Sequence, residues 1–150
     1  KGISPSDASG PVSKPVAVTH AGPKIEAGVK LLISIAGSII EGATVQEAVS
    51  ARIAAQDMQY PGFPATKWVK LPPRRVIGRL VSSACYLEDA LPAVLYLALK
   101  YGADAESSLV ENTMAGGDNV HRGAVLGALA GLEKGLDAFP SRWIEGLKTP

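Results

Sequence analysis

The residues best suited to chemistry lie together near the C-terminal end of the sequence, between Ala115 and Gly131. Two glycines are followed by a carboxylate, an amide, an imidazole and a guanidinium: Gly116, Gly117, Asp118, Asn119, His121 and Arg122. Glycines let the backbone turn sharply and let a ligand come close to backbone amides. The start of a helix favours anions such as phosphate, and a carboxylate there could hold Mg²⁺ through oxygen. The stretch is therefore a candidate site for a phosphate-containing ligand and a metal ion.

The same stretch also allows a purely structural interpretation. Asp118 or Asn119 would then cap the helix that follows, and the side chains of His121 and Arg122 would be solvated. A motif of this length is compatible with both interpretations.

Other candidate residues give weaker signals. His20, beside Thr19, could position a substrate, but a structural hydrogen bond is the simpler expectation. Cys85 is expected to be a small buried side chain, since no neighbouring histidine would activate it. Glu88 and Asp89 point in different directions from a helix, so we expect them to stabilise its first turn.

A proline-rich segment carries four cations that could contact phosphate or an acidic partner, although solvated charges are the default for a loop: Lys67, Lys70, Arg74 and Arg75. The two tryptophans, Trp68 and Trp143, are predicted to be packing anchors.

Helical periodicity predicts the elements that position these residues. Apolar residues recur at spacings of three and four, which favours helices over residues 24–41, 44–58, 87–100, 105–113, 119–134 and 140–147. A capping box starts the second of these helices at Thr44, and Pro92 is expected in the first turn of the third. Residues 60–75 contain four prolines and predict a loop, and residues 76–84 are ambiguous. No run alternates like a strand for long, so the predicted fold class is all-α, a compact helical bundle.

The N-terminal segment is rich in Ser, Pro and Gly. We predict a flexible lead-in over residues 1–17, an extended stretch over residues 15–23, and a single helical domain over residues 18–150.

Four glycines recur at intervals of four in the predicted helix 119–134 and at its end: Gly123, Gly127, Gly131 and Gly135. Each glycine weakens an isolated helix by roughly 1 kcal/mol relative to alanine. We therefore predict a central buried helix whose backbone is closely approached by a neighbouring helix or a ligand.

Composition narrows the class of protein further. The chain has 150 residues and a net charge of +1, so no basic field favours general nucleic-acid binding. Its single cysteine rules out an intrachain disulfide framework and fits a reducing intracellular compartment. The longest apolar stretches are about half of the roughly 20 residues that a membrane span needs, so no span is expected.

Residues 115–131 resemble the C-terminal signature of the ADP-ribosylglycohydrolase family, in which Gly-Gly-Asp-x-Asp-Thr leads into a helix rich in glycine and alanine. Segments at Thr19-His20, Tyr86–Pro92 and Pro140–Leu147 also look like family segments in the same order. The resemblance implies an all-α fold and a paired Mg²⁺ site that hydrolyses an ADP-ribosyl glycosidic bond. It implies that Asp118 is a metal ligand, and that the other five candidate residues named at the outset bind the substrate, ADP-ribose.

Two departures from the family pattern define what to expect of this chain. It has no Thr-Asp-Asp motif and resembles only the C-terminal half of the family domain, and Val120 stands where the family has its second aspartate. We therefore name no catalytic residue, and expect hydrolysis only if another chain or the N-terminal half is supplied. The alternative is a non-catalytic interaction subunit of a larger complex. Either way, we expect exposed apolar surface that a partner covers.

Overall fold

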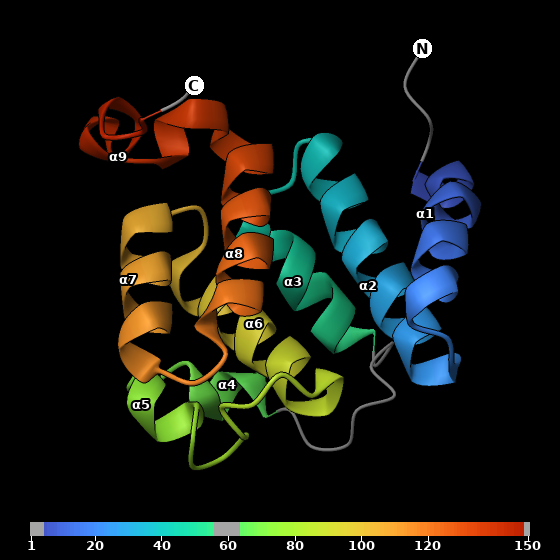
Figure 1. Cartoon of the computed structure of the whole chain (residues 1–150), viewed down its shortest axis with the longest axis horizontal. Helices are drawn as coiled ribbons and strands as arrows, with labels where there is room; N and C mark the ends of the chain where they lie inside the picture. The colour runs from blue at the N-terminus through green and yellow to red at the C-terminus, as the bar shows by residue number, and fades with distance from the viewer. Residues whose placement is uncertain (1–4, 56–63, 149–150) are drawn as a thin grey trace.

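The computed structural model describes residues 5–55 and 64–148, and these residues form helices without any strand. Figure 1 shows the helices packed side by side as a bundle. The α-helices are α1 (Pro5–Thr19), α2 (Pro23–Ile40), α3 (Val45–Ala54), α4 (Ala65–Trp68), α5 (Pro73–Val76), α6 (Leu87–Tyr101), α7 (Ala105–Ala115), α8 (Asn119–Lys134) and α9 (Ser141–Glu145). A short 3-10 helix, Gly135–Ala138, joins α8 to α9. The predicted all-α class is confirmed.

Helix α6 is the centre of the core. Its eight consecutive residues Leu91–Ala98 are all buried, which is the pattern of a helix surrounded by other elements. Helices α2, α3, α7 and α8 pack around it. They contribute apolar side chains such as Ile35, Val49 and Leu126, which are 4% exposed or less. None of the helices in the described part of the chain is long and apolar enough to cross a membrane.

Two helix starts follow the predicted local chemistry. The Thr44 hydroxyl accepts a hydrogen bond from the Glu47 amide (3.2 Å), and the Glu47 carboxylate accepts one from the Thr44 amide (2.9 Å), which completes the capping box of α3. Asp104 caps α7 by accepting from the Ser107 amide at 2.9 Å. Helix α3 is described to Ala54, and its predicted end near residue 58 lies outside the described residues.

The N-terminal segment differs from the prediction. Residues expected to be flexible or extended form α1, which continues to Thr19 despite Pro11 and Pro15 and lies along the outer side of α2 (Figure 1). Val16 of α1 is half-buried against α2. This packing favours a helix, although the Ser, Pro and Gly content of the segment does not. The predicted domain boundary at residues 17 and 18 stays a prediction.

The proline-rich segment also contains more structure than the predicted loop. From residue 64 onward it forms the two single-turn helices α4 and α5, with Pro73 in the first turn of α5. The Lys100 ammonium donates to the carbonyls of Val69 (2.6 Å) and Leu71 (3.1 Å), and the Tyr96 hydroxyl also donates to Leu71 (2.8 Å). These hydrogen bonds from α6 hold the segment in place. Its helices have four residues each, too few for a periodic pattern to predict them. Residues 60–63 lie outside the described part.

Two tryptophans and a proline complete the comparison with prediction. Trp68 is 9% exposed and belongs to the core, as predicted, and Trp143 is half-buried. Pro92 was expected in the first turn of its helix, but α6 begins at Leu87, so the proline falls in the second turn. Pro92 is one of the buried residues of α6.

Helix α8 is less buried than predicted, and its glycines have a different role. Only Arg122, Leu126, Leu129 and Ala130 are buried. A Cβ atom at Gly123 would lie 3.4 Å from the Asn112 side chain, and one at Gly127 or Gly131 would lie 3.7–3.9 Å from the Phe139 ring. Gly135 has a positive φ of 61° and ends the helix. The prediction of a closely approaching backbone is therefore wrong, because side chains occupy the space beside the glycines.

Candidate functional site

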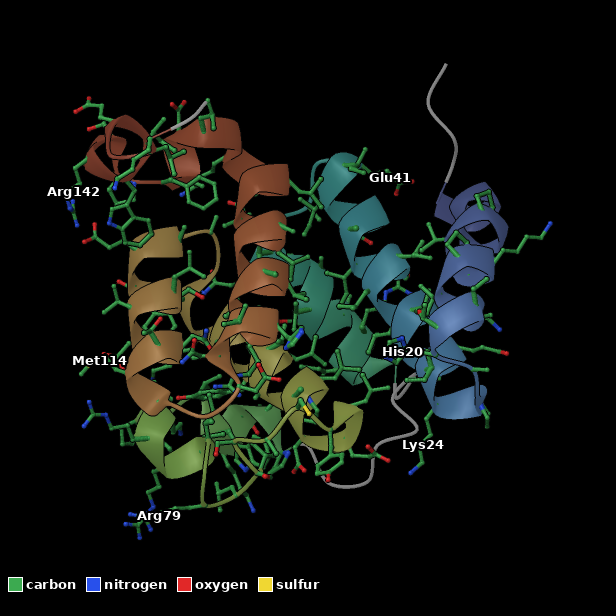
Figure 2. All side chains as sticks on the ribbon, in the orientation of Figure 1. His20, Lys24, Glu41, Arg79, Met114 and Arg142 are labelled. Carbon is green, nitrogen blue, oxygen red and sulfur yellow. The ribbon has the colours of Figure 1, made fainter. Side chains whose placement is uncertain are left out.

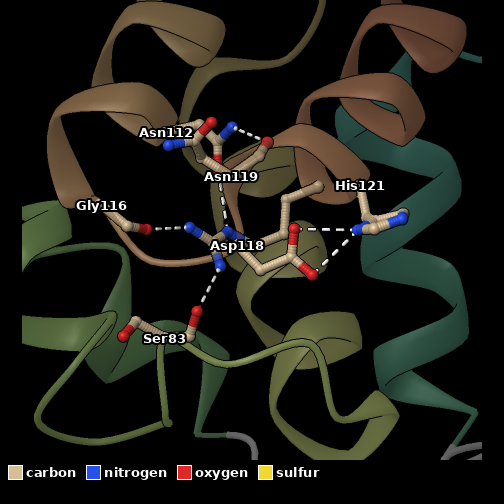
Figure 3. A network of polar contacts seen from close by, with 7 residues as sticks. Ser83, Asn112, Gly116, Asp118, Asn119 and His121 are labelled. Atoms are coloured by element: carbon tan, nitrogen blue, oxygen red, sulfur yellow. Dashed lines mark hydrogen bonds and ion pairs between the residues drawn. The ribbon is translucent and has the colours of Figure 1, made fainter.

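The candidate site is the turn between α7 and α8, drawn in Figure 3. Gly116 and Gly117 have φ angles of 76° and 66°, in the left-handed region that favours glycine. A Cβ atom at Gly117 would lie 2.2 Å from the carbonyl oxygen of Ser83, so no other residue fits there without a shift of the backbone. The predicted sharp turn is confirmed. Its close neighbour is the chain itself at Ser83.

Arg122 holds this turn from inside the protein. Its side chain is 1% exposed, and three of its nitrogens donate hydrogen bonds to protein acceptors. Nε donates to the Asn112 side chain (2.9 Å), Nη1 to the Ser83 carbonyl (3.3 Å) and Nη2 to the Gly116 carbonyl (2.6 Å). Burial lowers the pKa of Arg122, and the nearby carboxylate of Asp118 acts in the opposite direction. The interpretation of Arg122 as a solvated cation is thus wrong, because its donors point inward, and its role as a substrate contact stays a prediction.

Two residues that the sequence did not single out complete the support. Asn112, 1% exposed on α7, accepts from Arg122 and donates to the backbone carbonyl of Asn119 at 2.8 Å. The Ser83 carbonyl accepts a second bond from the Asp118 amide at 2.8 Å. Asn112 lies on the same face of α7 as the buried Ala105, so its position in the helical pattern was a signal that this polar side chain is buried. No local pattern in the sequence marks Ser83.

Asp118 lies at the surface of the turn and faces His121 (Figure 3). Both carboxylate oxygens are 2.8 Å from His121 Nδ1, and the side chains are 24% and 80% exposed, respectively. Asp118 is the N-cap residue of α8, but its side chain makes no capping bond to a backbone amide. The carboxylate therefore has a charged partner when the imidazole is protonated.

Some backbone amides of the turn already donate hydrogen bonds to other groups of the chain. Gly116 donates to Thr113 (3.0 Å) and Asn119 donates to Gly117 (2.9 Å), in addition to the bond from Asp118 to Ser83. The first turn of α8 has no side-chain cap, so its remaining amides are the ones that could bind an anion. Val120 lies in this first turn with 74% of its side chain exposed.

A Mg²⁺ site needs more oxygen ligands than this turn supplies. The ion is usually held by one or two carboxylates together with substrate oxygens and water. No group of three or more His, Cys, Asp or Glu residues that could hold a metal occurs in residues 5–55 and 64–148. Asp118 is the carboxylate of the turn, it pairs with His121, and Val120 offers no ligand. The residues described therefore do not fit a paired Mg²⁺ site by themselves.

The remaining candidates lie apart from the turn or act structurally. His20 Nδ1 is 2.9 Å from the Thr19 hydroxyl at the exposed end of α1. Glu88 pairs with Lys24 at 2.5 Å, and Asp89 accepts from the Ser82 amide at 2.9 Å, so the two carboxylates act separately, as predicted. Cys85 is exposed, which contradicts its predicted burial, because it lies in the turn before α6.

The family of the chain is identified by comparison with known proteins. The family model for ADP-ribosylglycohydrolase matches residues 6–149, which is almost the whole chain and includes the turn and all its supporting residues. Comparisons with curated proteins and with solved structures gave no match. Because the family match covers far more than half of the sequence, the chain belongs to the ADP-ribosylglycohydrolase family.

Proposed function

We propose that residues 116–122 are an ADP-ribosyl-binding turn, and that the chain hydrolyses an ADP-ribosyl glycosidic bond only when acidic residues outside it complete the site. The observation that carries this proposal is the buried guanidinium of Arg122, which fixes the turn while Asp118 stays at the surface. A turn that is ordered before the ligand arrives lowers the entropic cost of binding.

The expected ligand chemistry follows from the groups at the turn. The diphosphate of ADP-ribose is an anion, and the uncapped start of α8 favours anions. His121 is 80% exposed and adds a positive charge when protonated. Asp118 and Asn119 supply oxygen acceptors for ribose hydroxyl groups. In this proposal Gly116 and Gly117 shape the turn, and Arg122 positions it without touching the ligand.

Hydrolysis requires groups that the described residues lack. Asp118 could be one ligand of a Mg²⁺ ion, but Val120 removes the second carboxylate that the family resemblance implies. The missing ligands would come from a partner chain or from another part of the same protein. Exposed apolar side chains support such a partner, since Val110 and Met114 are 44% and 55% exposed and line a hollow of about 200 Å³ beside Trp143.

A second function is a non-catalytic subunit that keeps the scaffold of the family. The observation in its favour is the pairing of Asp118 with His121, which already satisfies the carboxylate without a metal ion. In this case the rigid turn is a remnant of the fold, and the exposed apolar surface is the functional part.

Calorimetric titration of the native protein with ADP-ribose, with and without Mg²⁺, tests the proposal. Binding that is lost in Asp118→Ala and kept in Asp137→Ala would support the ADP-ribosyl-binding turn. Asp137 is a suitable control because it is an exposed carboxylate on the 3-10 helix after α8, outside the turn. If the native assembly gives no heat with ADP-ribose, the proposal fails and the non-catalytic function remains.

The metal requirement is a separate measurement on the same samples. The described chain alone is expected to bind ADP-ribose equally well with and without Mg²⁺, because it supplies too few ligands. The assembled protein is expected to release free ADP-ribose from an ADP-ribosylated substrate only when Mg²⁺ is present. Hydrolysis by the chain alone would contradict the proposed need for outside residues.

A further inference from the structure

The positive charge of the chain is concentrated in one segment. Residues 64–87 contain five cations and no acidic residue. Since the whole chain has fifteen Lys and Arg and fourteen Asp and Glu, the remaining residues carry ten cations against all fourteen acids, a net charge of −4. We call the five side chains the basic surface: Lys67, Lys70, Arg74, Arg75 and Arg79.

All five side chains of the basic surface are exposed. Helices α4 and α5 and the turn that follows them lie at the end of the bundle opposite α9 (Figure 1), and Arg79 points away from the bundle there (Figure 2). The ion pairs found among the described residues do not include any member of the basic surface. These charges are therefore not neutralised by the chain's own described carboxylates.

The backbone beneath these cations is firmly held. Val76 and Ile77 are 0% and 2% exposed and belong to the core, and the carbonyls of Val69 and Leu71 accept hydrogen bonds from Lys100. The scaffold is thus ordered before any partner binds. Only the cationic side chains have to be immobilised on binding, which lowers its entropic cost.

We propose that the basic surface docks an acidic segment, rich in Asp and Glu, of a partner protein. This inference goes beyond the proposed ADP-ribosyl binding and does not depend on it. Exposed charges of one sign at one end of a molecule steer and hold a segment of the opposite sign. Glu88 and Asp89 directly follow residues 64–87, and Asp89 accepts from the Ser82 amide, so the acidic segment is expected to contact the part of this end that carries Lys67 to Arg79.

Other polyanions fit the basic surface less well. Single-stranded nucleic acid is bound by basic grooves that also offer aromatic side chains for stacking. Of the two aromatic residues in 64–87, Trp68 is only 9% exposed, which leaves Tyr86, 68% exposed, as a single side chain for stacking rather than a series of them. A helix that lies on a membrane inserts an exposed apolar face into the lipid, whereas the apolar residues Ala65, Trp68 and Val76 of α4 and α5 are buried in the protein.

Fluorescence polarisation with a labelled decaglutamate peptide tests the proposal on the full chain. We expect saturable binding that weakens at least about tenfold in the variant Lys70→Glu/Arg74→Glu/Arg79→Glu and weakens as salt is raised. The matched control, Lys14→Glu/Lys30→Glu/Lys134→Glu, changes the net charge equally at exposed positions elsewhere and should bind like the unmodified chain. Circular dichroism establishes that each variant is folded.

Three results would overturn the proposal. The first is an absence of saturable binding by the unmodified chain at low salt. The second is an equal loss of affinity in the control, because net charge rather than the basic surface would then be responsible. The third is tighter binding of oligothymidine, or of vesicles containing phosphatidylserine, than of the peptide. If the triple variant does not fold, Arg74→Gln/Arg79→Gln replaces it, and unchanged affinity in that variant would refute the docking role.

Discussion

The buried guanidinium of Arg122 gives the sharpest prediction about stability. Replacing it by methionine keeps an unbranched side chain of similar length in the core but removes all three hydrogen bonds of the guanidinium. Ser83 keeps a donor, because the Asp118 amide also binds its carbonyl. The Asn112 side-chain oxygen and the Gly116 carbonyl lose the donor that Arg122 supplies.

The magnitude follows from these two acceptors. Leaving a buried acceptor unsatisfied costs roughly 1–3 kcal/mol. Removing a buried charge also removes its desolvation cost, which offsets part of the loss. We therefore expect Arg122→Met to lower the free energy of unfolding by about 3 kcal/mol, a large part of the roughly 5–15 kcal/mol that stabilises a typical domain.

Urea denaturation followed by circular dichroism measures this change. The midpoint should fall by about 1–2 M with little change in the slope of the transition. Arg74→Met is the matched control, since Arg74 is exposed and its loss should change stability by less than about 0.5 kcal/mol. A loss below about 1 kcal/mol in Arg122→Met would refute the role assigned to the guanidinium, because the turn would then hold its shape without it.

Three further predictions concern the glycines and one helix cap. Gly117→Ala should cost more than Gly116→Ala, because its Cβ would meet the Ser83 carbonyl oxygen at 2.2 Å. Gly116, with nothing within 4 Å, carries only the roughly 1–3 kcal/mol cost of its φ of 76° and ψ of −163°, and equal losses in urea titrations would contradict this. Gly127→Ala should stabilise the protein by up to about 1 kcal/mol, because alanine favours a helix and the added Cβ would lie 3.9 Å from the Phe139 ring, an ordinary contact. A lower thermal midpoint in this variant would contradict the prediction. The hydrogen bonds from Ser107 lower the pKa of Asp104, so its stabilising contribution is present above its unfolded pKa and is lost as pH falls through the folded value. The difference in thermal midpoint between the unmodified chain and Asp104→Ala should accordingly shrink in acid, and a difference independent of pH would rule out this linkage.

Local patterns in the sequence determined much of the fold. The spacing of apolar residues in α2, α6 and α8 predicted those helices because one face of a helix is encoded within a few turns. The capping box at Thr44 and the cap at Asp104 involve partners three residues away, so a sequence displays both partners at once. The Gly-Gly-Asp motif carried the family resemblance that the match over residues 6–149 confirms.

Tertiary structure decided which of the candidate side chains are buried and which stay exposed. Arg122 looked like part of the site because it follows Asp118 in the motif, yet its partners Ser83 and Asn112 are 39 and 10 residues away in the sequence and turn it inward. Helix α1 likewise depends on α2, and the glycines of α8 face the Asn112 and Phe139 side chains. Burial and hydrogen-bond satisfaction depend on neighbours that are distant along the chain, and residue type and spacing do not encode them.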